Sequence, residues 1–145
     1  MFRHILVPVG LGAGSRAAVR HALYLSRWLG CKVTLLHVLE QPNPSIAETL
    51  ARMVQEARYQ PRVLMVEPHS QSIGAVVAQT AQQTQADLVV IACHDTGRKA
   101  PQALGLVAQS ILVNASVPVQ VVPPTMQIQH KPWLRRFWPR EAHEV

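Results

Sequence analysis

The strongest constraint on the fold of this chain is an alternation of short, β-branched apolar runs with longer segments of helical period. The apolar runs predict strands at residues 4–9, 32–38, 62–67, 87–93 and 117–122. The segments between them predict helices at residues 15–29, 45–59, 72–85 and 103–114. Because such alternation builds βαβ units, we predict a single α/β domain with a doubly wound, five-stranded parallel sheet and helices on both faces.

Residue types at the ends of these segments support the helix assignments. Ser15, Ser45 and Ser72 are predicted N-caps, and Gly30 is predicted to stop the first helix. The apolar stripe of that helix is predicted to consist of Ala18, Ala22, Leu25 and Leu29.

The composition favours one compact domain. The chain has 145 residues, of which 48% are hydrophobic, and this is enough for a substantial core. No stretch approaches the ~20 apolar residues of a membrane span, and the N-terminus lacks the features of a secretory signal, so we expect a cytoplasmic protein. Cys31 and Cys93 are expected at opposite ends of parallel strands, which excludes a disulfide; both are predicted to be small buried side chains.

The formal net charge is +6, and part of the positive charge lies on the first predicted helix. Arg16, Arg20 and Arg27 fall within about 40° of one another at 3.6 residues per turn. This face is either simply solvated or an electropositive surface for an anionic partner. Nucleic-acid binding is not expected, because aromatic residues do not alternate with basic ones outside the C-terminal segment.

Ligands of doubly wound sheets bind at the carboxyl ends of strands, where the winding direction reverses. The loops at residues 8–15 and 92–105 are therefore expected to border the site. The first of them, VGLGAGS, has glycines at positions 10, 12 and 14. Three roles remain open for these glycines. They give the backbone flexibility, or their amides hold a small anion, or they bind a dinucleotide whose ribose is held by Glu40.

The histidines do not predict a metal or catalytic site. His4 and His37 alternate with core residues on neighbouring strands and are predicted to be hydrogen-bonded within the fold. Cys93 and His94 are adjacent in sequence, but neighbours in a strand point to opposite faces, so we do not predict a nucleophile–base pair. No spacing of His and Cys suggests a metal.

The segments HILVPVG, SRAAVRHALYLSRWLGCKVTLLHV, ADLVVIACH and LGLVAQSILVNASVPVQVVPP occur in this order over residues 2–124. In these segments the chain resembles the universal stress protein family. The resemblance implies a flavodoxin-like, Rossmann-like fold and a homodimer formed by antiparallel pairing of the last strands, here through Val119, Gln120, Val121 and Val122. Pairing is also physically sensible, because this strand is expected at a sheet edge with unpaired backbone groups.

Nucleotide-binding members of the family share Gly-x2-Gly-x9-Gly-Ser/Thr after the fourth strand and an Asp two residues after the Pro of the first strand. On this chain the glycine positions are Ala92, Asp95 and Gly105, the hydroxyl position is Leu106, and the acid position is Gly10. Only one glycine is retained, and a carboxylate is added where phosphates would lie. If each loss costs ~1 kcal/mol, affinity for ATP falls on the order of a hundred- to thousandfold.

We therefore predict weak or lost binding of ATP or AMP and no metal. Gly97, Arg98 and Lys99 could supply compensating donors to an anion. The set that the resemblance places around the crevice is Pro8, Gly10, Val38, Ala92, Cys93, His94, Asp95, Gly97, Arg98, Gly105, Leu106 and Val107.

The segment 125–145 follows the family-like domain of residues 1–124 and combines aromatic with basic side chains. In a short helix Trp133, Phe137 and Trp138 would gather on one side. Three interpretations remain open: the rings cover the domain or its dimer mate, they dock on another protein, or they contact the inner face of the membrane.

The functional hypothesis from the sequence is a non-enzymatic, cytoplasmic regulatory dimer that acts through protein contacts. The alternative is an adaptor without a ligand that docks through the C-terminal segment. A slow ATP hydrolase would need a base and a metal site, and Asp95 has no second carboxylate near it in the sequence.

Overall fold

The computed structural model describes residues 2–10, 13–55, 60–93 and 104–123. Strands and helices alternate along the chain: β1 (His4–Pro8), α1 (Ala13–Leu29), β2 (Lys32–Val38), α2 (Ile46–Gln55), β3 (Arg62–Val66), α3 (Ile73–Gln83), β4 (Leu88–Ala92), α4 (Leu106–Asn114) and β5 (Val119–Val122).

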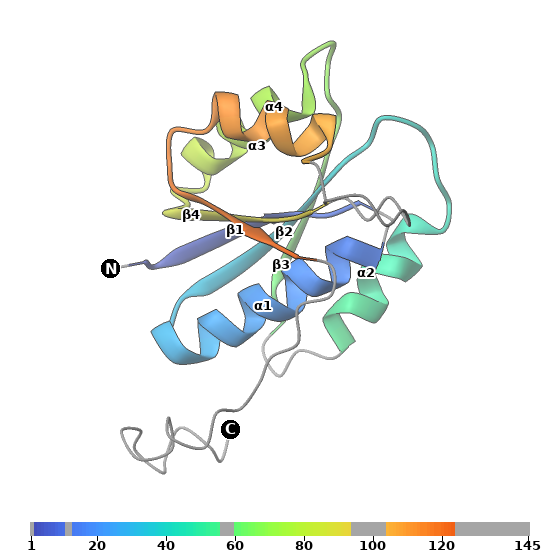
Figure 1. Ribbon diagram of the computed structural model, residues 1–145. Coiled ribbons are helices and arrows are strands. Elements are labelled where there is room, and N and C mark those ends of the chain that lie inside the picture. The colour runs from blue at the N-terminus through green and yellow to red at the C-terminus, as the bar shows by residue number, and fades with distance from the viewer. Residues whose placement is uncertain (1, 11–12, 56–59, 94–103, 124–145) are drawn as a thin grey trace.

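All five strands form one parallel sheet in the order β3-β2-β1-β4-β5 (Figure 1). The chain runs outward from β1 through β2 to β3, then returns to the other side of β1 for β4 and β5. The winding direction therefore reverses between β1 and β4. The predicted fold class is confirmed.

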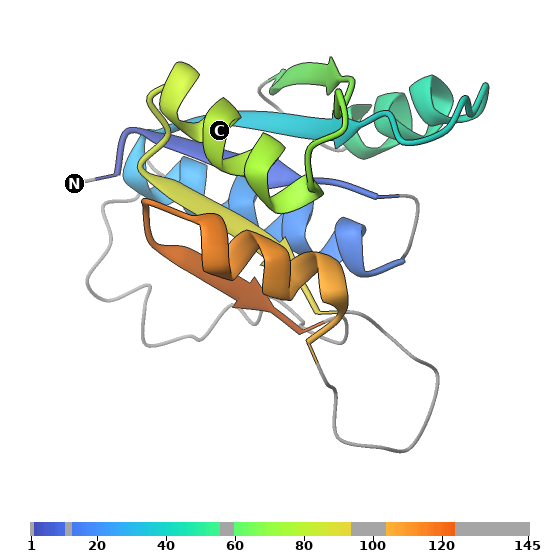
Figure 2. The same ribbon diagram turned by 90° about the horizontal axis from the view of Figure 1, so that it is seen from above.

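Helices cover both faces of the sheet (Figures 1 and 2). The core therefore consists of one apolar layer on each face. Helices α1 and α2 cover one face through residues such as Ala18, Val19 and Leu50. Helices α3 and α4 cover the other through Val76, Val77 and Ile111. Side chains of β1 and β4 are buried on both faces, and each fully buried Val, Leu or Ile contributes about 1.5–3 kcal/mol relative to exposure.

Helix α1 begins earlier than its sequence predicts. It starts at Ala13, so Ser15 lies in the first turn and is not the N-cap. The Ser15 Oγ instead accepts a hydrogen bond from the Gly10 N–H at 2.8 Å, which ties the preceding loop to the helix. At the other end Leu29, predicted to face the sheet, is 39% exposed as the last helical residue. Gly30 ends the helix with a positive φ of 64°, as predicted.

Of the other two predicted N-caps, Ser72 is confirmed and Ser45 is not. Ser72 is the N-cap of α3, since its Oγ accepts from the Ala75 N–H at 3.1 Å. Ser45 directly precedes α2, but its hydroxyl donates to Asn43 Oδ1 and caps no helical N–H.

Two boundaries near the C-terminus also differ from prediction. Helix α4 starts at Leu106, after the predicted residue 103, because Gly105 has extended backbone angles and accepts from the Gln109 N–H as the N-cap. Strand β5 starts at Val119 because Pro118 has no N–H to donate, although its carbonyl still accepts from Val89.

Helices α3 and α4 touch at a glycine. The Gly74 N–H donates to Ser110 Oγ at 3.2 Å, and a Cβ on Gly74 would lie 2.2 Å from the Ser110 carbonyl oxygen. No side chain fits at this position. The contact fixes how α4 lies beside α3, and thus where Gly105 and the start of α4 are held.

Candidate functional site

The crevice expected from the winding reversal lies at the carboxyl ends of β1 and β4. The two strands pair only through Ile5 with Leu88 and Leu6 with Val89. Pro8, which ends β1, and Ala92, which ends β4, lie beyond these pairs and are both half-buried. The strands are thus joined at their amino ends and unpaired where a ligand would enter.

The start of α1 packs directly against the end of β4. A Cβ on Gly14 would lie 2.8 Å from the Cys93 carbonyl oxygen and 3.3 Å from the Ala92 Cβ. Gly14 is therefore required for close approach of helix and strand. Gly10 is exposed, has no positive φ and would have space for a methyl group, so backbone flexibility does not explain it.

The second border of the crevice is the loop between β4 and α4. Cys93 is half-buried and its N–H donates to the Val122 carbonyl at 2.9 Å, which anchors this border to β5. Gly105 caps α4 with its backbone alone. His94, Asp95, Gly97 and Arg98 lie outside the described residues.

Leu106 stands at the position where the resemblance places a hydroxyl, and Val107 follows it. Leu106 is 85% exposed and Val107 is 48% exposed at the first turn of α4. Neither side chain can donate a hydrogen bond to a phosphate, so only backbone N–H groups of this turn remain as donors. The first turn of α4 also contains no acidic residue.

Val38, which the resemblance places at the site, is mostly buried in the core. It ends β2, is 8% exposed and packs with the α3 and α4 layer. Beside it the His37 Nδ1–H donates to the Val9 carbonyl at 2.8 Å. His37 is therefore hydrogen-bonded within the fold, as predicted, and supports the end of β1.

Among the described residues no group of three or more His, Cys, Asp or Glu side chains could hold a metal ion. Cys31 and Cys93 are free thiols and half-buried, which is less than the full burial predicted. Burial raises the pKa of the Cys31 thiol above its ordinary value.

Sequence reasoning missed His21, on the stripe of α1 that also contains Gly14 and Ala18. His21 is 7% exposed, and within the described part of the chain neither ring nitrogen has a hydrogen-bond partner. A buried imidazole without partners costs stability. A lone histidine inside an otherwise apolar helical stripe was the available signal.

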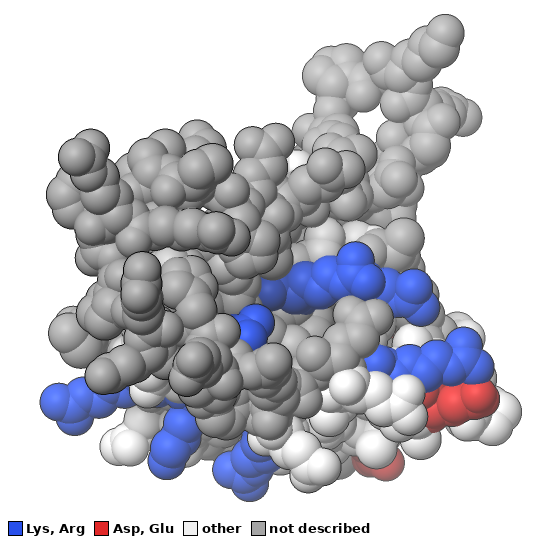
Figure 3. Space-filling model, turned by 90° about the horizontal axis from the view of Figure 1, so that it is seen from below, with Lys and Arg blue, Asp and Glu red and all other residues white. Residues whose placement is uncertain are grey.

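The arginines predicted to share a face of α1 are all exposed. Arg16 and Arg20 line a hollow of about 300 Å³ between α1 and α2, together with Arg52. Figure 3 views the molecule from the side of α1 and α2, and lysine and arginine side chains predominate over acidic ones on its described surface. The Arg52 guanidinium donates to Glu48 Oε1 at 2.6 Å, one turn away.

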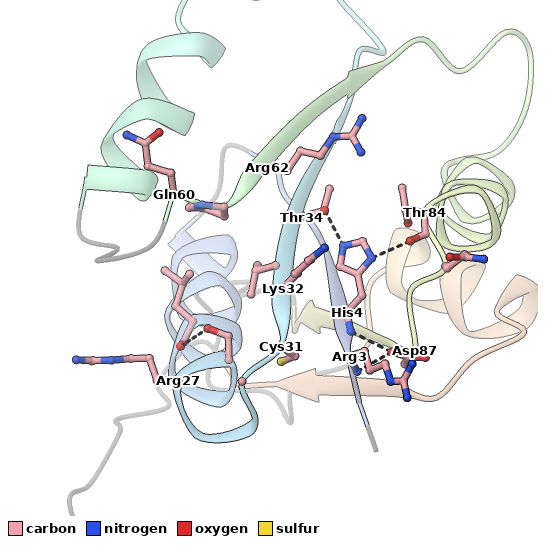
Figure 4. Close-up of a pocket in the computed structure, with 16 residues that line it drawn as sticks. Arg3, His4, Arg27, Cys31, Lys32, Thr34, Gln60, Arg62, Thr84 and Asp87 are labelled. Carbon is pink, nitrogen blue, oxygen red and sulfur yellow. Dashed lines mark hydrogen bonds between the residues drawn. The ribbon is translucent and has the colours of Figure 1, made fainter. Parts of the chain in front are cut away.

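A larger hollow lies at the opposite end of the sheet, around the amino ends of β1, β2 and β3 (Figure 4). Its volume is about 1200 Å³, and the sequence analysis did not identify it. Beside it Asp87 Oδ2 accepts from the N–H groups of Arg3 at 2.7 Å and His4 at 3.0 Å. These bonds lower the pKa of Asp87 below its ordinary value and join β1 to the start of β4.

His4 lies under this hollow and is hydrogen-bonded on both sides, as predicted. Its Nδ1–H donates to the Thr84 carbonyl at 2.9 Å, and its Nε2 lies 2.7 Å from Thr34 Oγ1. With Nδ1 protonated, the neutral ring accepts the Thr34 hydroxyl proton at Nε2.

Comparison with known proteins gives a family and a fold. The profile of the Universal stress protein family matches residues 1–123. No curated protein matches the chain. Among the described residues no helix is long and apolar enough to cross a membrane.

Three similar solved structures share the fold. A universal stress protein from Archaeoglobus fulgidus is 18% identical, with a TM-score of 0.70, and the match covers 84% of this chain and 99% of that one. A universal stress protein in complex with cAMP is 16% identical, with a TM-score of 0.67 and coverage of 86% and 98%. The Archaeoglobus fulgidus universal stress protein in complex with dAMP is 19% identical, with a TM-score of 0.67 and coverage of 83% and 98%.

Proposed function

The chain belongs to the universal stress protein family, and from this we propose that it is a small regulatory dimer that acts through protein contacts, catalyses no reaction and binds ATP or AMP weakly or not at all. Solved relatives of the same fold are complexes with cAMP and dAMP. We expect a nucleotide to bind in the crevice, because ligands of doubly wound sheets bind at the carboxyl ends of the strands where the winding reverses.

One observation carries the proposed loss of ATP binding: the phosphate end of the crevice offers an apolar first turn of α4. Leu106 is 85% exposed at the position of the family's hydroxyl donor, and Gly105 supplies no side-chain donor. Across the crevice Gly10 has no carboxylate to accept from a nucleoside. Asp95 adds negative charge to the same loop, which opposes a triphosphate.

Backbone geometry supports the proposed homodimer. Strand β5 is at one edge of the sheet and pairs with β4 on one side only. Among the described residues no strand pairs with the other edge of β5, where Gln120 is exposed and Val119 and Val121 are half-buried, whereas Val122 is 1% exposed. The neighbouring surface of α4 is unusually apolar, because Leu106, Val107, Leu112 and Val113 are all exposed. Burial of this surface against the second copy would add to backbone pairing.

The C-terminal segment supplies the second candidate function. We propose residues 1–124 as the family domain and 125–145 as a separate docking segment; the family match ends at residue 123. Trp133, Phe137 and Trp138 lie outside the described residues. Aromatic rings among arginines favour a partner protein or the inner face of the membrane, with the domain itself in the cytoplasm.

Thermal melting of the full chain tests the ligand proposal. A ligand at a hundred times its Kd adds ~2.7 kcal/mol of stability, so millimolar ATP, AMP or dAMP should leave Tm nearly unchanged. A large rise with ATP that persists in a Lys32→Gln, Arg62→Gln variant, changed at the opposite end of the sheet, would contradict the proposed loss of binding at the crevice.

Sedimentation of wild type and Val121→Pro tests the dimer, since proline removes a donor from β5. An unchanged oligomeric state would refute pairing through β5.

A further inference from the structure

The large hollow at the amino ends of the strands brings two cationic side chains onto one face of the sheet. Thr34 on β2 pairs with Arg62 on β3, and His4 on β1 pairs with Lys32 on β2. Side chains two residues apart on a strand share a face, so Lys32, Thr34, Arg62 and His4 lie on the same face. Figure 4 shows Lys32 and Arg62 on the same side of the sheet as the His4 ring and Thr34.

Lys32 and Arg62 have no ionic partner in the part of the chain that the structure describes. Both residues are exposed. Asp87 is the one carboxylate in the described lining, and its Oδ2 is already bonded to two backbone N–H groups. The described lining also includes Arg3, so the cationic side chains Lys32, Arg62 and Arg3 outnumber the one carboxylate.

The positions of Lys32 and Arg62 are not explained by a need to offset the negative end of a helix. In this fold the helices end where the strands begin, and a cation in the last helical turn offsets the partial negative charge of the helix C-terminus. Arg27 is such a residue in α1, and in Figure 4 its side chain points away from Lys32 and Arg62. Lys32 and Arg62 instead belong to strands, and α3 has no basic residue in its last turn.

The polar atoms at the base of the hollow are already hydrogen-bonded within the protein. The hydrogen bonds of His4 to Thr34 and Thr84 pair the polar atoms beneath the cations, and Thr34 is 2% exposed. A ligand would therefore be held by charge. The described lining contains no Phe, Tyr or Trp on which a nucleobase could stack.

We propose that this hollow binds an oligophosphate, an anion of two or more linked phosphoryl groups, through Lys32 and Arg62. Arginine presents a planar fork that matches phosphate oxygens, and lysine binds phosphate as a point charge. From a strand spacing of ~4.8 Å and a rise of ~3.3 Å per residue, the two Cα atoms lie about 8 Å apart, so two phosphoryl groups can each meet one cation. The volume of about 1200 Å³ accommodates such an anion without deformation of the sheet.

Isothermal titration calorimetry with sodium tripolyphosphate, pyrophosphate and orthophosphate at constant ionic strength tests the proposal. The full chain should bind tripolyphosphate most tightly, and the double variant Lys32→Gln, Arg62→Gln should bind it at least about tenfold more weakly. The matched control is Arg16→Gln, Arg52→Gln, which removes two exposed charges from the hollow between α1 and α2. It should change affinity less than about twofold if binding is local.

Three outcomes overturn the proposal. Equal weakening by both double variants would show that binding follows net charge alone. Tighter binding of a thymidine oligonucleotide than of tripolyphosphate would assign the hollow to a nucleic-acid backbone. A lower melting temperature of the Lys32→Gln, Arg62→Gln variant without a change in affinity would make the pair structural.

The proposal is independent of the crevice. ATP held here by its triphosphate should respond to Lys32→Gln, Arg62→Gln and not to changes at Leu106, whereas ATP held in the crevice should show the reverse. Failure of one proposal therefore leaves the other standing.

Discussion

The two ends of the parallel sheet differ in how they could attract an anion. At the carboxyl ends of the strands the helices begin, and the backbone N–H groups of α1 and α4 supply partial positive charge. At the amino ends the helices finish, so the backbone contributes partial negative charge and any attraction must come from side chains.

We propose that in this chain the first end is the weaker site for an anion and the second end the stronger one. At the carboxyl end Leu106 and Ala92 occupy positions of a hydroxyl and a glycine in the family pattern. At the amino end Lys32 and Arg62 lie on one face without described ionic partners. If both proposals hold, the side chains at each end, and not the fold alone, decide where an anion binds.

The largest expected effect concerns the scaffold of the carboxyl end. Gly74→Ala places a methyl group against the Ser110 carbonyl, which as backbone cannot rotate away, and should lower the free energy of unfolding by about 3 kcal/mol. Urea denaturation measures the loss. Gln82→Ala, at an exposed position of the same helix, is the control and should change stability by less than about 0.5 kcal/mol. Equal stability of both variants would mean that α3 and α4 are not held at this glycine.

Two substitutions toward the family pattern in the loop after β4 should raise the affinity of the carboxyl end for ATP. Asp95→Gly with Leu106→Ser removes a charge that repels phosphate and adds a hydroxyl donor, so affinity for ATP should rise about tenfold or more. Calorimetric titration with ATP checks this. Asp95→Gly with Val113→Ser is the matched control, because Val113 is 84% exposed on the same helix. No gain over that control would refute our account of the loop.

Gly10 in the loop after β1 and Gly14 in the first turn of α1 should respond differently to alanine. Gly14→Ala brings a Cβ to 2.8 Å from the Cys93 carbonyl oxygen, and this strain should exceed the gain in helix propensity and cost about 1 kcal/mol. Gly10→Ala meets only Ser15 Oγ at 3.8 Å and should be nearly neutral. Thermal unfolding of the pair measures the difference, and a stabilising Gly14→Ala would show that α1 can move away from β4.

The smallest effect is expected at the amino end, where Asp87 joins β1 to the start of β4. Its pKa is lowered in the folded state by the N–H groups of Arg3 and His4, so its charge stabilises the fold above about pH 4 and this contribution is lost as the pH falls through the folded pKa. Asp87→Asn should therefore be less stable than wild type at pH 7, and the difference should shrink as the pH falls below about 4. Urea denaturation at pH 7 and at a series of lower pH values measures it, with the exposed Glu48→Gln as control.

Much of the fold was predictable because its signals are local. Apolar alternation and helical period, visible within a few residues of His4 or Ser72, gave every described strand and helix and the parallel arrangement. The boundary errors at Ser15 and Leu106 arose where hydrogen bonds outside the helix decided its start. Of the residues predicted to line the crevice, Pro8 and Ala92 are the last residues of β1 and β4, and their contact with a ligand stays a prediction.

The sequence by itself thus determined the class of fold, the order of its elements and the departure from the family's phosphate pattern. Only the tertiary structure decided which distant residues meet: Gly14 with Cys93, Gly74 with Ser110, and Lys32 with Arg62 on one face of the sheet. The physical reason is that periodicity depends on neighbours in the chain. Strand register and helix docking are instead fixed by the packing of the whole core, to which every element contributes.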